Sequence, residues 1–132
     1  MARPHPILVE PQHPLVQRVR DVCLAFPEAV EVEAWGRPTF RAGKRVFVLV
    51  GSAMDRDLCI VFKPDPDDRL ALAQDPRFFD PPYWGGSNGW LGIDIDPPDT
   101  DWTELAELID SSYRQVALKR QLTALDARGT TV

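Results

Sequence analysis

The sequence predicts one α+β domain with two layers, in which an antiparallel β-sheet carries helices on one face. The chain has 132 residues, which is enough to bury a hydrophobic core within a single domain. Residues 30–62 hold short runs rich in β-branched and aromatic residues, and the short connections between them favour antiparallel pairing. Apolar residues with helical spacing lie before and after this region. The expected order is helix, three or four strands, helix, one or two strands, and helix.

A proline-rich lead over residues 1–12 precedes the first predicted helix. Four apolar residues then share one helical face, at i, i+4, i+7 and i+11: Leu15, Val19, Val22 and Phe26. The helix should end near Phe26, because the residue before Pro27 is disfavoured in the α region. We expect the domain itself to cover residues 13–118.

Four strands are predicted between residues 30 and 62. Residues 30–35 alternate with a period of two, and Gly36-Arg37-Pro38 should interrupt the pattern before it resumes at Thr39. Gly43-Lys44 is typical of a hairpin turn and leads to the run 45–50. A second turn leads to the run 58–62, which completes an antiparallel meander.

A short helix and two strands are predicted next. Asp65-Pro66 has the features of a helix start, and Asp75-Pro76 should end that helix. Phe78-Phe79 is expected to add a brief strand. Residues 90–95 predict the last strand, with alternate apolar residues on one side: Leu91, Ile93 and Ile95.

A long helix closes the predicted domain. Asp101 and Glu104 have capping-box spacing, and an apolar face of about four turns follows: Trp102, Leu105, Ile109, Tyr113 and Val116. Residues 119–132 are predicted to be a tail, with a short helical stretch over 122–127.

Composition excludes several classes of protein. No apolar run approaches the ~20 residues that cross a bilayer, and no secretory signal is visible, so we expect a cytoplasmic protein without membrane contact. Cys23 and Cys59 each lie within a hydrophobic run, which predicts buried thiols rather than a zinc or redox pair. His5 and His13 are the only histidines, so hydrolase chemistry assisted by histidine is not expected.

Charge is unevenly distributed along the chain, whose net charge is −5. In residues 37–63, six basic residues against two aspartates give +4, whereas in residues 64–113 twelve acids against two arginines give −10. Residues 114–132 return to +3, with four basic residues against one aspartate. An acidic protein can still engage phosphates through one positive face.

The order of several motifs resembles the YjbR/MmcQ family of small bacterial domains. The resemblance covers about residues 15–118 and rests on Phe26-Pro27, the segment from Trp35 to Arg41, the hairpin 43–47, Pro82-Tyr83 followed by Gly89-Trp90-Leu91, and residues 110–117. It implies an α+β fold similar to the CyaY-like and secretion-chaperone-like arrangements. Proteins of this family are described as DNA-binding, a description that carries over by fold and not by a defined chemical site.

The predicted hairpin supplies the strongest physical case for DNA. A twisted β-ribbon can enter a groove, and its cations can displace counterions from phosphates. The candidate residues are Arg37, Arg41, Lys44 and Arg45, together with Arg114, Lys119 and Arg120 near the end of the last helix. The alternative is that these charges only keep sheet edges from aggregating.

The loop over residues 81–93 places two tryptophans around three glycines. It is either a structural clasp on the core or a ligand platform on which a base or planar molecule could stack. The candidate platform residues are Tyr83, Trp84, Asn88 and Trp90. Residues 85–89 do not form a phosphate loop, because no lysine-serine pair or helix follows.

Neither a metal site nor catalysis is predicted. The acids Asp94, Asp96, Asp99 and Asp101 miss the EF-hand spacing, and acids at a helix start need no metal to explain them. No serine or cysteine has a neighbouring base. We therefore predict a non-catalytic binding domain without a cofactor and with DNA as partner. The alternatives are a protein partner or self-association through the sheet face, and a small-molecule or enzymatic pocket at the Trp/Gly loop.

Overall fold

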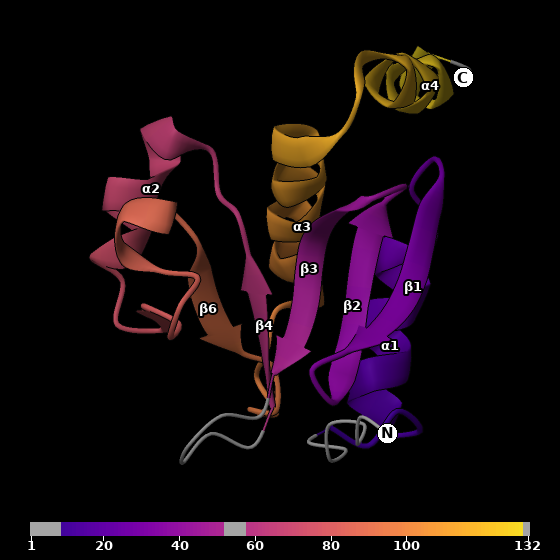
Figure 1. The fold of residues 1–132 in the computed structure, drawn as a ribbon. Helices are drawn as coiled ribbons and strands as arrows, with labels where there is room; N and C mark the ends of the chain where they lie inside the picture. Colours follow the sequence, from indigo (N-terminus) through magenta and orange to yellow (C-terminus); the bar gives the residue numbers. More distant parts are fainter. Residues whose placement is uncertain (1–8, 52–57, 131–132) are drawn as a thin grey trace, which may run out of the picture.

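The computed structural model describes residues 9–51 and 58–130 and confirms the α+β prediction. In chain order the helices and strands are α1 (Pro14–Cys23), β1 (Ala29–Ala34), β2 (Arg37–Ala42), β3 (Arg45–Gly51), β4 (Cys59–Phe62), α2 (Pro66–Ala73), β5 (Phe78–Phe79), the 3₁₀ turn η1 (Gly86–Asn88), β6 (Leu91–Asp94), α3 (Trp102–Val116) and α4 (Lys119–Thr130). The strands form one sheet in the order β1-β2-β3-β4-β6-β5, and every neighbouring pair is antiparallel. Helices α1 and α3 lie behind this sheet (Figure 1).

The face of the sheet that α1 and α3 cover carries the main hydrophobic core. One row of cross-strand neighbours on this face runs through Phe40, Val48, Phe62 and Leu91, all of which are buried. Tyr113 of α3 packs against the same face, with its ring 5.2 Å from that of Phe47. Its hydroxyl donates a hydrogen bond to the Pro27 carbonyl at 2.7 Å. Burial of these large side chains is the main source of stability for the domain.

Ser112 ties α3 to the middle of the sheet. Its hydroxyl donates to the Phe47 carbonyl at 2.5 Å and accepts from the Lys63 backbone N–H at 2.8 Å. The register between β2 and β3 shifts at Phe40/Arg41, so that Phe47 and Val48 both belong to the main core. A β-bulge of this kind leaves backbone groups outside the ladder, and the buried serine satisfies one of them.

Local capping rules set the helix starts. The carboxylates of Asp65 and Asp101 accept backbone N–H bonds at the starts of α2 and α3, as the sequence predicted. His13 caps α1 in the same way, because its Nδ1 accepts from the Leu15 N–H at 3.1 Å. This cap was not predicted from the sequence pattern.

Three predicted boundaries differ from the structure. Helix α1 ends at Cys23, three residues before Phe26, and α4 extends over 119–130 where a shorter stretch was expected. Pro38 lies inside β2 rather than breaking it. The turn is made by Trp35 and Gly36 alone, both with positive φ (56° and 77°), as in the tight hairpins that match strand twist. Strand β3 pairs with β2 only from Thr39 onward, so Pro38 lies beyond the part of β2 that is paired on both sides.

Candidate functional site

The opposite face of the sheet, which we call the open face, holds a pocket. Residues directly opposite each other in antiparallel strands share a face. One such row crosses all six strands through Val32, Thr39, Leu49, Val61, Gly92 and Phe79. Leu49 and Val61 form a second, smaller hydrophobic cluster with Trp90, separate from the main core. Apolar side chains therefore point to both faces of the central strands.

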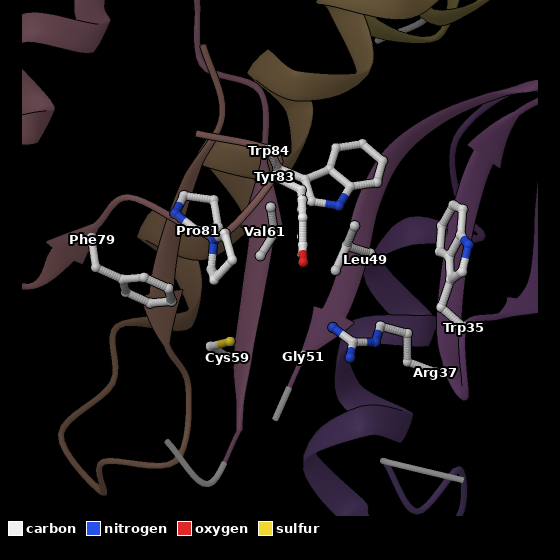
Figure 2. Close-up of a pocket in the computed structure, with 11 residues that line it drawn as sticks. Trp35, Arg37, Leu49, Gly51, Cys59, Val61, Phe79, Pro81, Tyr83 and Trp84 are labelled. Atoms are coloured by element: carbon white, nitrogen blue, oxygen red, sulfur yellow. The ribbon is translucent and has the colours of Figure 1, made fainter. Parts of the chain in front are cut away.

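The open-face pocket has a volume of about 800 Å³, which lies in the range of ~300–1,000 Å³ usual for small-molecule sites. Figure 2 shows its side chains, with Leu49 and Val61 between two walls. One wall comes from the β1–β2 turn and the start of β2, and the other comes from β5 and the loop that follows it. The lining residues are Trp35, Arg37, Leu49, Gly51, Cys59, Val61, Phe79, Pro81, Pro82, Tyr83 and Trp84.

Three tryptophans connect the two walls. The ring centroids of Trp35 and Trp84 are 6.0 Å apart, and those of Trp84 and Trp90 are 4.7 Å apart, both in edge-to-face geometry. Such pairs contribute about 0.5–1.5 kcal/mol beyond the area that they bury. Trp90 is buried at 8% exposure, whereas Trp35 is 47% exposed. The row of rings is thus anchored at one end and accessible at the other.

Hydrogen bonds hold the loop over residues 81–90 in shape. The Asp80 carboxylate accepts from the Gly86 N–H at 2.9 Å and from the Arg69 guanidinium at 2.8 Å. The Asn88 side-chain amide donates to the Tyr83 carbonyl at 2.8 Å, and the backbone N–H of Trp90 donates to the backbone carbonyl of Trp84 at 3.1 Å. The loop is therefore ordered by its own contacts before any ligand arrives.

The four predicted platform residues take different places. Trp84 is half-buried and Tyr83 is 94% exposed, and both line the pocket. Trp90 lies beneath Trp84 in the small cluster, and Asn88 braces the loop. The loop thus acts as a clasp through Trp90 and Asn88 and forms a pocket wall through Tyr83 and Trp84.

Among the described residues that line the pocket, Arg37 is the one that carries a charge. Figure 2 shows its guanidinium directed along the open face toward Gly51 and Cys59. The Nη1 atom lies 3.6 Å from the position that a Cβ at Gly51 would occupy, and the Cys59 sulfur lies 3.0 Å from the same point. A Cβ at Gly51 would therefore crowd the Cys59 sulfur, whereas it would only touch the Arg37 guanidinium at ordinary van der Waals distance.

The other predicted cations do not gather around this pocket. Arg41 donates to the Thr39 hydroxyl on the open face, while Lys44 and Arg45 are exposed at the β2–β3 turn. Arg114 pairs with Asp110 and Asp126 at 2.7 and 3.1 Å. Arg120 pairs with Glu28 at 2.9 Å, and the bond from Arg120, followed by that from Gln121, lowers the pKa of Glu28. Lys119 is exposed at the start of α4.

The structure offers no reactive group with a catalytic partner among the residues that it describes. Both cysteines are buried, as predicted, and burial raises the pKa of the Cys23 thiol well above its usual value. A thiol of that kind is a poor nucleophile. Within residues 9–51 and 58–130, no three His, Cys, Asp or Glu side chains come together as they would around a metal ion.

None of the described helices is both long and apolar enough to span a lipid bilayer.

Most of the pocket was not foreseen from the sequence. Trp35, Leu49, Val61, Phe79 and Pro81 were assigned only to strands or loops. Trp35 lies on a two-residue turn with positive φ, a position that buries little of a side chain, and this was the one available signal that it faces solvent.

Comparisons with known proteins agree with this fold. The family model described as YjbR matches residues 24–115. The chain is also similar to the crystal structure of Deinococcus radiodurans protein DR2400, whose domain is described as DUF419. The TM-score is 0.65 at 24% identity, over 84% of this chain and 87% of that chain, and at this identity the likeness shows the fold alone. No match was found among curated proteins. Since the family model spans well over half of the chain, the protein belongs to the YjbR family.

Proposed function

We propose that this protein is a non-catalytic binding domain that takes a flat, largely apolar ligand in the open-face pocket. The observation that carries the proposal is a pocket of about 800 Å³ whose walls are the rings of Trp35, Phe79, Tyr83 and Trp84. Aromatic walls around a preformed hollow suit a planar molecule, because ring faces contribute contact area at little cost in side-chain entropy.

The side-chain contacts around the pocket support binding rather than chemistry. Most of the described lining is apolar, and within it the Arg37 cation has no acid or base beside it. General acid–base or nucleophilic catalysis needs such a pair within hydrogen-bond reach. Recognition of shape and charge is what this arrangement can supply.

Indole N–H signals give a direct test, because the four tryptophans differ in position. Trp35 and Trp84 line the pocket and Trp90 packs beneath them, whereas Trp102 lies under the Arg18 guanidinium, 4.4 Å from its ring centroid. We expect the neutral probe 2-naphthamide, titrated into ¹⁵N-labelled protein, to shift the signals of Trp35 and Trp84 and to leave that of Trp102 in place. Unchanged Trp35 and Trp84 signals up to millimolar probe would refute the proposal.

Two variants localise the site. Trp84→Ala should weaken 2-naphthamide binding about fivefold to about 150-fold, since a base or ring stacked on an aromatic side chain is worth about 1–3 kcal/mol. Trp102→Ala is the matched control, because Trp102 is a half-buried tryptophan outside the pocket, and it should bind as the parent does. Light scattering on the same samples checks the alternative of self-association. If the protein were a dimer and the probe did not shift the Trp35 and Trp84 signals, the open face would be the interface with a second copy of the chain.

DNA binding by the basic hairpin is a second candidate. It is favoured by Lys44 and Arg45, which are exposed and make no ion pair with any carboxylate of the described residues. Each phosphate contact contributes about 0.9 to the slope of log K against log salt concentration, so Lys44→Gln with Arg45→Gln should lower that slope by about two. Arg114→Gln with Arg120→Gln is the control pair, because both side chains are held in ion pairs. If neither duplex nor single-stranded DNA bound the protein in a titration at low salt, DNA binding would be ruled out as its function.

A further inference from the structure

We infer that the ligand of the open-face pocket is an aromatic carboxylate whose anionic group binds Arg37. The inference rests on the proposed function, because it names the chemical class of ligand for the same pocket. It is carried by one feature that a purely apolar site would not need, namely a cation among the lining side chains.

The guanidinium of Arg37 has no counter-charge in the described structure. Within residues 9–51 and 58–130, no carboxylate lines the pocket, and Arg37 takes part in none of the ion pairs. Its Nε atom is shielded from solvent and has no hydrogen-bond acceptor. A charged donor in this condition raises the free energy of the folded protein, and an anion at the guanidinium offsets that cost.

Arg37 differs from several other arginines of the described residues, which have an interaction partner. Five of them make ion pairs with carboxylates of the described residues: Arg20, Arg69, Arg77, Arg114 and Arg120. Arg18 lies over the Trp102 ring, and Arg41 donates to the Thr39 hydroxyl. The pocket arginine is therefore a half-buried cation for which the described part of the chain supplies no partner.

Geometry and charge favour a carboxylate as that partner. The guanidinium is planar and can form two parallel hydrogen bonds with the two oxygens of a carboxylate. One positive charge balances one carboxylate, whereas a phosphate monoester brings a charge of about −1.5 to −2 that no second cation of the lining would balance. The ring walls of Trp35, Tyr83 and Trp84 then receive an aromatic body attached to the acid.

The test compares two probes that differ only in charge. Naphthalene-2-carboxylate and 2-naphthamide have the same ring system, and we expect the acid to bind roughly tenfold to a hundredfold more tightly, as for a charge-assisted hydrogen bond. Affinity is measured by calorimetry and by the Trp35 and Trp84 indole signals. In the variant Arg37→Gln this preference should disappear, because the acid should lose much more affinity than 2-naphthamide, whose neutral carbonyl gains less from the guanidinium.

Arg41→Gln is the matched control for charge. Arg41 lies two residues further along β2, on the same open face and equally half-buried, but it does not line the pocket. The variant Arg41→Gln should therefore keep the preference for naphthalene-2-carboxylate over 2-naphthamide. If Arg37→Gln weakened the binding of both probes by the same factor, Arg37 would act on the shape of the pocket rather than on the charge of the ligand, and this would overturn the inference.

Other outcomes separate the inference from the proposed function. Equal affinities for acid and amide, unaffected by Arg37→Gln, would overturn the inference and leave the pocket as a binding site for flat neutral molecules. Tighter binding of 2-naphthyl phosphate than of the carboxylate would overturn the choice of anion. If none of the three probes shifted the Trp35 and Trp84 indole signals, both the inference and the proposed function would be wrong.

Discussion

The two faces of the sheet are both apolar, but only one of them is fully covered. The row through Phe40, Val48 and Phe62 packs under α1 and α3 in the main core. The row beside it, through Leu49 and Val61, packs on Trp84 and Trp90 of the loop that follows β5, and the pocket opens above it. A one-sided antiparallel sheet usually shows a polar outer face. An apolar outer face with a partial cover is instead typical of a surface that binds something.

The two faces should therefore differ in what they contribute to the protein. Side chains on the covered face should determine stability and leave ligand affinity unchanged once the protein is folded. Side chains on the open face should determine affinity and contribute less to stability. Substitutions on one face should therefore change one of these two quantities far more than the other.

The two tyrosines of the chain provide the sharpest contrast. Tyr113 is fully buried with its ring stacked on Phe26 at a centroid distance of 4.7 Å, whereas Tyr83 is 94% exposed. Tyr113→Ala should lower the free energy of unfolding by about 3–5 kcal/mol, because it leaves a large cavity. Tyr83→Ala, the matched control, should leave it within about 0.5 kcal/mol. Urea denaturation measures both, and equal losses would contradict the division.

The two adjacent serines of α3 test the covered face with a smaller change. Ser112→Ala leaves the Phe47 carbonyl and the Lys63 N–H without their partner, which should cost about 1–3 kcal/mol. Ser111 is only half-buried and makes none of these bonds, so Ser111→Ala should be close to neutral. The comparison uses the urea midpoint at constant slope. A neutral Ser112→Ala would show that water replaces the hydroxyl.

Gly92 tests whether the open face is packed as tightly as the covered one. A Cβ at this position would lie 2.3 Å from the Phe79 ring, so Gly92→Ala must displace that ring. Overpacking of this kind costs about 1–3 kcal/mol. The same substitution in a Phe79→Ala background should cost much less, and a double-mutant cycle of unfolding free energies measures the difference. Equal costs in both backgrounds would mean that Phe79 is not what Gly92 accommodates.

The smallest expected effect is a pH dependence of stability that arises from Tyr113 on the covered face. Burial, and then the charge of Glu28, raise the pKa of the Tyr113 hydroxyl above its ordinary value. Since the folded protein holds the proton more tightly than the unfolded chain, this contribution to stability is complete below about pH 10 and is lost as the pH rises further. Tyr113→Phe lacks the titrating group and should show a shallower loss of stability over this range. Parallel urea midpoints for both proteins would contradict the prediction.

Local rules predicted the elements of the fold well. Asp65 and Asp101 marked helix starts because a cap needs only the next two or three residues. Pro38 was misplaced because its tolerance in β2 depends on where β3 stops pairing, which no local pattern contains. The full length of α4 was also missed, since Gln121 is buried through contacts with Leu118 and Glu28 rather than by an apolar stripe.

The site was harder to predict because it depends on register. Strands β3 and β4 are apolar at nearly every position, so the sequence does not tell which residues face the helices and which face the pocket. Only the pairing of Leu49 with Thr39 and Val61 places them on the open face. The partner of Arg120 and the more distant partner of Arg114 were equally hard to predict, because Glu28 and Asp126 are brought near by folding, whereas Asp110 lies only four residues before Arg114.

The loop that clasps the open face is fixed by Asp80, Asn88 and Trp90, while Tyr83 projects from it with almost no buried area. Anchoring and contact with the outside are thus assigned to different side chains of one short segment. Engineering could exploit this separation, because a library randomised at Tyr83 would vary the rim of the hollow while the scaffold stays folded. The domain is in this respect a compact frame on which new recognition properties could be selected.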